Sequence, residues 1–242
     1  MSLRPMLAVI PARGGSKGLP RKTVREFAGL PLIAHSIRLA GMCPEIDRSI
    51  VSTDSEEVAT VARAHGAEVP FLRPEELARD DTPMLPVLKH ALRECETRGG
   101  QHYKSLLLLD PTSPGRLPED VSGALAMLEN DSNACGVVAV SEPHFNPRWV
   151  CVEEQDGYAR MAFTQGKQYT RRQDVAPVYR INALLYLWKC DYLRSAEKLD
   201  FGGAPHLLWK VPEQRAVHID ELHDFELGEL LVTNGIVQLP WL

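Results

Sequence analysis

The chain has 242 residues, 44% of them hydrophobic and 24% charged, which is ordinary for a folded soluble protein and excludes a disordered chain, a collagen and a coiled coil. The net charge of −5 disfavours broad nucleic-acid binding, so a local basic cluster must meet any anionic ligand. No apolar run approaches the roughly 20 residues of a membrane span, and the first apolar stretch is too short for a signal peptide. Five cysteines without a CxxC pair indicate reduced thiols in the cytoplasm.

Strand-like and helix-like segments alternate over the first 140 residues. Short apolar runs predict buried strands at 6–10, 48–52, 67–72, 105–109 and 135–140. Between them, Ser55 followed by two glutamates starts a helix that Gly66 ends, and apolar stripes predict helices around Leu88 and Leu125. The alternation predicts an α/β fold with a mostly parallel sheet and helices on both faces. Ligands of such sheets bind beyond the carboxyl ends of the strands.

The alternation stops over residues 142–178, which are polar and aromatic and rich in Pro and Gly. The segments 149–153 and 158–163 are expected to pair as a hairpin, and we interpret the whole stretch as a lid or an oligomerisation arm. The core then resumes with a strand at 184–188, a helix, a strand at 207–211 and a final helix from about Leu222. We therefore expect one domain over residues 1–242 with an inserted excursion over 142–178 that serves as a dimerisation arm.

The loop after the first strand carries the strongest functional signal. It reads PARGGSKGLPRK from position 11 to position 22, with clustered glycines and basic residues in a chain that is acidic overall. Glycines let backbone N–H groups approach an anion, and basic side chains at the carboxyl end of a strand suit a polyphosphate. The glycine spacing fits neither the Walker motif nor the dinucleotide motif GxGxxG. The alternative is a solvated basic turn in which the glycines serve backbone geometry alone.

The sequence IPARGGSKGLPRK resembles the signature of the acylneuraminate cytidylyltransferases, the CMP-sialate synthetase family. The resemblance continues through VSTD at 51–54, FLRPEEL at 71–77, PTSP at 111–114 and YRIN at 179–182, and covers nearly the full chain. It implies a nucleotide-binding fold like that of the A-type glycosyltransferases. It also implies transfer of CMP from CTP to the anomeric hydroxyl of a nonulosonic acid (sialic, legionaminic or related), with release of pyrophosphate and with Mg²⁺ as cofactor. In this family a homodimer shares its sites through the excursion, so Arg171 or Arg172 is expected to reach the partner's site.

The resemblance also implies roles for individual residues, which we state as expectations. The nucleotide is expected to contact Arg13, Gly14, Gly15, Ser16, Lys17, Lys22, Thr23 and Arg73. Two of these are expected to stabilise charge in the transition state, Arg13 and Lys17. The sugar acid is expected to contact Asp110, Arg172, Gln173, Arg180 and Asn182. The metal ligand is expected to be Asp220.

Asp110 and His218 are among the positions that depart from the family pattern, as are Thr23, where relatives often have Asn, and Thr82 and Met84 near the base. Asp110 stands where relatives often have Gln, so it could bind Mg²⁺, accept protons of sugar hydroxyls, or only cap the following turn. An acidic residue there casts doubt on N-acetylneuraminate as substrate and makes legionaminic-type acids candidates. His218 stands where an Asp is common, and Mg²⁺ prefers oxygen ligands, so His218 is expected beside the metal ligands and not among them.

Some alternatives stay open on the sequence alone. Arg73 could pair with Glu75 or Glu76 instead of the nucleotide, and Asp224 is expected to cap a helix in preference to binding metal. The protein could be a nucleotidyltransferase for another sugar acid or another base. It could also be a dimeric nucleotide-binding protein without catalytic activity.

Overall fold

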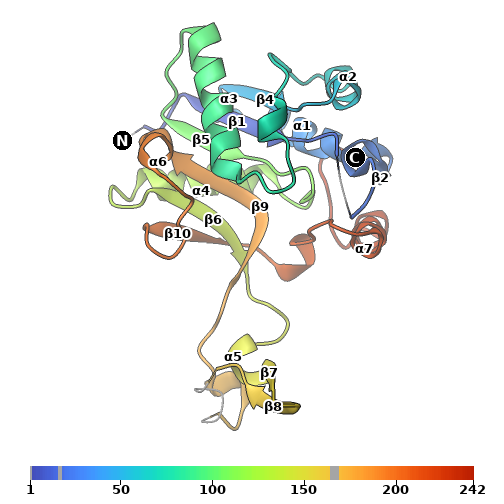
Figure 1. Cartoon of the computed structure of the whole chain (residues 1–242), viewed down its shortest axis with the longest axis vertical. Helices are drawn as coiled ribbons and strands as arrows, with labels where there is room; N and C mark the ends of the chain where they lie inside the picture. The colour runs from blue at the N-terminus through green and yellow to red at the C-terminus, as the bar shows by residue number, and fades with distance from the viewer. Residues whose placement is uncertain (1, 16–17, 164–168) are drawn as a thin grey trace.

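A six-stranded sheet forms the centre of the computed structural model, which describes residues 2–15, 18–163 and 169–242 (Figure 1). The strand order is β10-β6-β9-β5-β1-β4. The bounds of these strands are β1 Met6–Pro11, β4 Arg48–Ser52, β5 Ser105–Leu108, β6 Gly136–Ser141, β9 Arg180–Lys189 and β10 His206–Lys210. Strand β1 pairs in parallel with β4 and β5, and β6 pairs in parallel with β10. The mostly parallel sheet is therefore confirmed, with β9 as the antiparallel exception.

The predicted strand over 67–72 is wrong. The segment lies beside β4 but forms only two isolated bridges, from Ile50 to Glu68 and from Thr53 to Leu72. Pro70 lies between them and has no N–H group to donate to a ladder. This stretch is an irregular edge of the sheet.

Helices cover both faces of the sheet, as predicted. The longer helices are α1 Leu32–Met42, α2 Glu56–Ala64, α3 Met84–Gly99, α4 Pro118–Glu129, α6 Cys190–Ser195 and α7 Leu222–Thr233. Alternate residues of β1 serve the two faces: Met6, Ala8 and Ile10 pack with α1, α2 and α4, whereas Leu7 and Val9 pack with α3 and α6. This two-sided burial explains why β1 is a continuous apolar run. Within the described residues, no helix combines the length and apolar character needed to cross a membrane.

A third apolar cluster connects the start of the chain with its end. It contains Leu19, Phe27, Leu32, Ile219 and Phe225. These residues come from the end of the glycine-rich loop, the short strand β2 (Glu26–Phe27), α1, the segment before α7, and α7 itself. The short helix η1 (Lys22–Val24) and strand β3 (Leu30–Pro31) lie in the same stretch of chain. The cluster fixes the loop beside residues 217–225.

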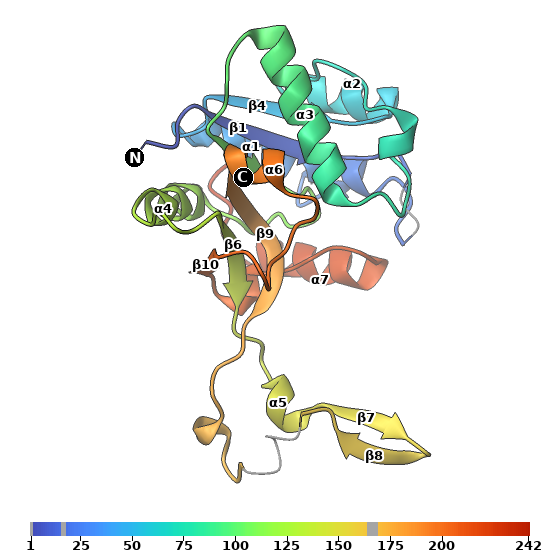
Figure 2. The same cartoon turned by 60° about the vertical axis from the view of Figure 1, so that its left-hand side comes forward.

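The segment 142–178, called the arm below, projects from the sheet between β6 and β9 (Figures 1 and 2). It holds α5 (Pro147–Val150), β7 (Val152–Gln155), β8 (Tyr158–Met161) and the turn η4 (Arg172–Asp174). The predicted hairpin is confirmed in kind, with Asp156 and Gly157 at positive φ in its turn. Its predicted bounds are wrong, because Trp149 and Val150 belong to α5, where Pro147 occupies the first helical position and Asn146 caps the N-terminus.

Candidate active site

The carboxyl ends of β1, β4 and β5 meet at one edge of the sheet, since these strands are parallel. The glycine-rich loop follows β1, Thr53 and Asp54 follow β4, and Asp110 follows β5. Backbone hydrogen bonds like those between paired strands hold the ends of these three strands together. The N–H of Ala12 donates to the carbonyl oxygen of Ser52 (3.0 Å), and the N–H of Leu109 donates to the carbonyl oxygen of Val9 (3.0 Å). The structure therefore brings the motifs of the sequence to the edge where α/β folds bind ligands.

The glycines of the loop have different surroundings. A Cβ atom on Gly14 would lie 2.7 Å from Cβ of Ser55, and one on Gly18 would lie 2.5 Å from the carbonyl oxygen of Asp220. Both glycines are therefore required by close packing within the chain. For Gly15, no atom of the described residues lies within 4 Å of such a Cβ, so the described part of the chain leaves its backbone open to a ligand. Asp54 Oδ1 accepts the N–H of Gly14 at 2.9 Å and helps to hold the loop.

Ser16 and Lys17, which the sequence assigns to the triphosphate, lie outside the described residues. Arg13 forms an ion pair with Asp80 and keeps part of its side chain exposed. Thr23 lies in η1 and is half-buried. Arg13 is thus a partly exposed cation of this loop, and Arg21, which pairs with Glu57, is exposed as well.

Lys22 points inward. Its side chain is buried, and Nζ donates to the carbonyl oxygen of Ile219 at 2.6 Å and to Oδ1 of Asp220 at 3.2 Å. The predicted nucleotide residue and the predicted metal ligand are therefore in contact. Asp220 itself is exposed, so its carboxylate stays accessible.

Arg73 is also buried and is fixed by its own chain. Its guanidinium donates to the hydroxyl (3.2 Å) and the carbonyl oxygen of Ser52 and to the carbonyl oxygen of Leu77 (3.5 Å), and not to Glu75 or Glu76. Burial lowers the pKa of Arg73 to about 10, although the charge of Asp54 opposes this effect. The arginine is still charged at neutral pH and places a cation beneath the loop.

Asp110 closes a turn directly after β5. Its Oδ1 accepts hydrogen bonds from the N–H of Thr112 at 3.0 Å and from the hydroxyl of Thr112 at 2.8 Å. Asp110 thus caps the turn, which is one of the roles that the sequence left open. Among the described residues, only this oxygen of the carboxylate is engaged, which leaves Oδ2 for a ligand. Burial, together with the charge of Asp110, raises the pKa of Tyr186 to about 12, so the phenol stays neutral.

Arg116 is a residue of this site that sequence reasoning missed. It is fully buried, and its guanidinium donates to the carbonyl oxygens of Asp110 and Ser113 and to the hydroxyl of Ser36. Burial lowers its pKa to about 10. Arginine is rarely buried, so no pattern in the sequence marked it. Arg116 holds the loop that carries Asp110.

The residues expected to bind the sugar acid divide into two groups. Arg180 and Asn182 lie on β9, at the same edge as Asp110: Arg180 pairs with Glu213 at 2.9 Å, and Asn182 is buried with its Nδ2 lacking a partner among the described residues. Arg172 and Gln173 lie in η4, at the far part of the arm from the sheet (Figures 1 and 2). Within one chain, the structure does not bring this second group to the crevice.

His218 and Asp224 surround Asp220. His218 lies 3.2 Å from Asp220 Oδ2, and Oδ2 of Asp224 accepts the N–H groups of Asp220 (3.0 Å) and Glu221 (2.9 Å). These N–H groups hold the pKa of Asp224 below its usual value. The prediction that Asp224 caps a helix is confirmed, because it forms a capping box with Glu221 at the start of α7.

A metal ion at this edge would have few protein ligands. In the described part of the chain, no group of three or more His, Cys, Asp and Glu side chains is arranged to hold a metal. Asp220 offers exposed carboxylate oxygens of the kind that Mg²⁺ prefers. The residues present therefore fit Mg²⁺ only if a bound nucleotide completes the coordination, as is usual for Mg²⁺ at phosphates.

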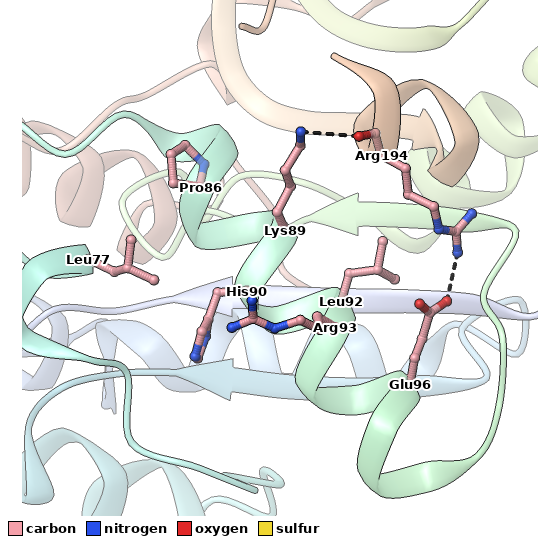
Figure 3. Close-up of a pocket in the computed structure, with 8 residues that line it drawn as sticks. All are labelled: Leu77, Pro86, Lys89, His90, Leu92, Arg93, Glu96 and Arg194. Atoms are coloured by element: carbon pink, nitrogen blue, oxygen red, sulfur yellow. Dashed lines mark hydrogen bonds and ion pairs between the residues drawn. The ribbon is translucent and has the colours of Figure 1, made fainter. Parts of the chain in front are cut away.

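A separate cavity of about 490 Å³ lies over α3, α6 and the short helix η2 (Glu75–Leu77) (Figure 3). Its charged groups already have partners within the chain: Lys89 donates to the carbonyl oxygens of Arg194 (3.2 Å) and Ala196 (2.7 Å), and Arg194 pairs with Glu96 at 2.7 Å. The cavity contains none of the loop residues described above.

The strand order and the loop-lined edge define an α/β protein of the kind that binds ligands beyond the carboxyl ends of its strands. The profile of one family, described as cytidylyltransferase, matches residues 7–196. The chain therefore belongs to the cytidylyltransferase family.

Individual proteins show the same relationship. The chain is 36% identical over 231 residues to the CMP-N,N'-diacetyllegionaminic acid synthase of Legionella pneumophila, covering 94% of this chain and 96% of that protein. It is 34% identical over 236 residues to the Post-translational flagellin modification protein B of Campylobacter coli, covering 96% and 97%. Its fold is similar to a solved CMP:2-keto-3-deoxy-manno-octonic acid synthetase complexed with CTP, with a TM-score of 0.68, 18% identity and coverage of 95% and 98%.

Proposed function

We propose that this cytidylyltransferase transfers CMP from CTP to the anomeric hydroxyl of a nonulosonic acid of the legionaminic type and releases pyrophosphate. The observation that carries the proposal is the convergence of the glycine-rich loop, Asp110 and Asp220 at one edge of the sheet. The legionaminic acid synthase named above is similar to this chain over nearly its full length. This relative supports the proposed substrate class, and the site supports the proposed chemistry.

The nucleotide half of the site is formed by Arg13, Gly14, Gly15, Ser16, Lys17, Lys22, Thr23 and Arg73. The open backbone at Gly15 gives the phosphates a place to approach amide N–H groups. Arg13 and Lys17 are assigned to the charge that grows on the leaving pyrophosphate. Lys22 and Arg73 are both buried, and they add fixed positive charge on the protein side of the glycine-rich loop.

Asp220 is the ligand proposed for Mg²⁺. When bound with the triphosphate, Mg²⁺ offsets the negative charge that develops on the leaving group. Lys22 and His218 each contact one carboxylate oxygen of Asp220, so the side chain is oriented before any ligand binds.

The sugar-acid half of the site comprises Asp110, Arg180, Asn182, Arg172 and Gln173. Nδ2 of Asn182 is a buried donor with no partner in the described part of the chain, and such a group is costly unless a ligand or water satisfies it. Oδ2 of Asp110 can accept protons from sugar hydroxyls. A carboxylate at this position disfavours a second anionic group next to it, so the acid group of the sugar is expected to face the arginines.

The same proposal includes a homodimer with shared sites. The arm exposes large apolar side chains, namely Phe145, Val150, Val152, Tyr158 and Phe163, which a second subunit would bury. The arm carries Arg172 and Gln173 away from their own crevice, and a partner arrangement would bring them to the other site. We also place the protein in the cytoplasm, where its five free cysteines would stay reduced.

The test is a pyrophosphate-release assay. CTP, UTP, ATP and GTP are each combined with N,N'-diacetyllegionaminic acid, N-acetylneuraminic acid, pseudaminic acid and an eight-carbon 3-deoxy acid, with Mg²⁺ or with EDTA. Release only with CTP and Mg²⁺, and fastest with N,N'-diacetyllegionaminic acid, supports the proposal. Faster release with N-acetylneuraminic or pseudaminic acid would contradict the legionaminic assignment and keep the transfer of CMP to a nonulosonic acid. Release with another base or a shorter acid shows a different transferase. A thermal shift with CTP but no turnover shows a binding protein without catalytic activity.

A further inference from the structure

His218 lies between Asp220 and the loop that follows β5. Its Nε2 is 3.2 Å from Oδ2 of Asp220, and its Nδ1 is 3.1 Å from the hydroxyl of Ser113 and 3.3 Å from that of Thr112. The backbone N–H of Ile219 also donates to the carbonyl of Thr112 at 2.8 Å. We propose that His218 is a positioning residue that holds the Asp220 carboxylate in the orientation in which it binds the cation, an inference that rests on the proposed function.

The carboxylate of Asp220 determines which nitrogen of His218 carries the proton. A carboxylate can only accept, so Nε2 of His218 carries the hydrogen that points at Oδ2 of Asp220. The other nitrogen of the neutral imidazole, Nδ1, is then an acceptor, and the hydroxyl of Ser113 donates to it. The hydroxyl of Thr112 donates instead to Asp110 at 2.8 Å.

The series Ser113, His218 and Asp220 contains the residue types of a serine hydrolase triad, but burial excludes that chemistry. Ser113 is 0% exposed, so no substrate carbonyl can reach its oxygen. The serine fixes the imidazole, and the imidazole fixes the carboxylate.

The carboxylate of Asp220 is consequently held on both sides. Lys22 contacts Oδ1 and His218 contacts Oδ2, and each oxygen keeps a further lone pair for a cation. Hydrogen bonds of this kind to metal ligands typically contribute about 10- to 100-fold to metal affinity. Without His218, Lys22 alone would orient the carboxylate and would draw it toward the loop.

The test compares Ala, Asn and Gln at position 218. The amide nitrogen of Gln can take the place of Nε2 and donate to Asp220, whereas the amide of Asn ends near the place of Nδ1 and falls short. Mn²⁺ binding in the presence of CTP is measured by electron paramagnetic resonance, and the thermal unfolding midpoint is measured alongside. His223→Ala is the matched control, because His223 is an exposed histidine close by in sequence.

We expect His218→Ala and His218→Asn to weaken Mn²⁺ binding about 10-fold or more, and His218→Gln to stay within about threefold of the wild type. If His218→Ala unfolds, the Asn and Gln variants still give the comparison. Equal affinities for the Asn and Gln variants, or wild-type affinity for His218→Ala, would overturn this inference while leaving the proposed function intact. Absence of Mn²⁺ binding by the wild type would overturn the proposed metal use and this inference together.

Discussion

The ammonium of Lys22 lies 3.2 Å from Oδ1 of Asp220, across 198 positions of sequence. The same nitrogen donates to the carbonyl oxygen of Ile219 at 2.6 Å, and the side chain is buried. A lysine is buried only when its charge is compensated, so this contact fixes the end of the glycine-rich loop to the segment before α7. The contact thereby joins the residue proposed for the nucleotide to the residue proposed for the metal.

Replacing Lys22 by Met tests this connection. The apolar stem keeps its packing, but the carbonyl of Ile219 and the carboxylate of Asp220 lose their donor, so the free energy of unfolding should fall by about 1–3 kcal/mol. CTP affinity, measured by calorimetry, should fall at least about tenfold because one charge-assisted contact is lost. Arg63→Met is the control, since Arg63 pairs with Glu56 at 3.6 Å on the surface. Equal stability of the two variants would contradict the structural role of Lys22.

Alanine at Gly18 and at Gly15 should have opposite effects. A Cβ at position 18 would lie 2.5 Å from the backbone oxygen of Asp220, so Gly18→Ala should cost about 1–3 kcal/mol of stability. Gly15 has open space, so Gly15→Ala should change stability by less than about 0.5 kcal/mol and should weaken CTP binding instead. Denaturant titration and CTP calorimetry on both variants separate the two roles. A stable Gly18→Ala protein would count against the close packing of the loop on Asp220.

Asp120 forms the most buried ion pair among the described residues. It pairs with Arg215 at 2.6 Å, accepts the indole N–H of Trp209 at 2.9 Å, and caps the start of α4 through the N–H of Leu117 at 2.8 Å. Asp120→Ala should lower the free energy of unfolding by about 3–5 kcal/mol, because the largely buried side chain of Arg215 loses its partner and the N–H groups of Trp209 and Leu117 lose their acceptor. Asp191→Ala removes another aspartate that pairs with an arginine, but this side chain is 97% exposed, so the loss should stay below about 1 kcal/mol. The free energies of unfolding are measured by urea denaturation. Similar losses of stability for Asp120→Ala and Asp191→Ala would contradict the structural role of the Asp120 ion pair.

His35 should make stability fall in mild acid. It is buried, its Nε2 donates to the carbonyl of Phe27 at 2.9 Å, and its Nδ1 accepts the indole N–H of Trp241 at 3.0 Å. Burial lowers the pKa of His35 below its ordinary 6.5. As the pH falls below about 6.5, the unfolded chain takes up a proton that the folded chain refuses, so the free energy of unfolding decreases and levels off below the folded pKa. Each tenfold loss of proton affinity on folding corresponds to about 1.4 kcal/mol.

Unfolding free energies of the wild type and of His35→Gln, measured at several pH values between 5 and 7.5, check this dependence. Burial also lowers the pKa of His90, which adds a contribution of the same sign to both proteins and cancels in the difference. Trp241→Phe should reduce the pH dependence of the unfolding free energy, because Nδ1 of His35 no longer accepts the indole N–H and is free to accept a proton. Parallel curves for the wild type and His35→Gln would exclude His35 as the source.

The apolar arm should hold the proposed dimer together. Tyr158 is 68% exposed, and the double change Val152→Asp with Tyr158→Asp places charge on a surface that we expect a partner to bury. In sedimentation equilibrium, the wild type should have twice the mass of the chain and the double variant the mass of one. Leu230→Asp on α7 is the control, since that leucine is 59% exposed but lies outside the arm. A monomeric wild type, or dissociation by Leu230→Asp alone, would rule out the arm as the interface.

Much of the fold could be predicted because its signals act over a few residues. The run at 48–52 and the helix start at Leu222 agree with the structure, since apolar strands and helix caps are local features. The edge at 67–72 could not be predicted, because a hydrophobic run with a proline resembles a strand until its pairing is known. The antiparallel direction of β9 could not be predicted either, because the hydrophobic pattern of a strand does not indicate the direction in which it runs in the sheet.

By itself, the sequence of this protein determined most of the elements, the glycine-rich basic loop, and a family resemblance that a comparison with known proteins then confirmed. Only the tertiary structure decided that Lys22 points inward, that Arg116 is buried beneath Asp110, and that His218 connects Ser113 with Asp220. The contacts of Lys22 and His218 join segments that lie far apart along the chain, and the burial of Arg116 depends on the packing around its loop. Burial and long-range hydrogen bonds arise only when the fold brings such segments together.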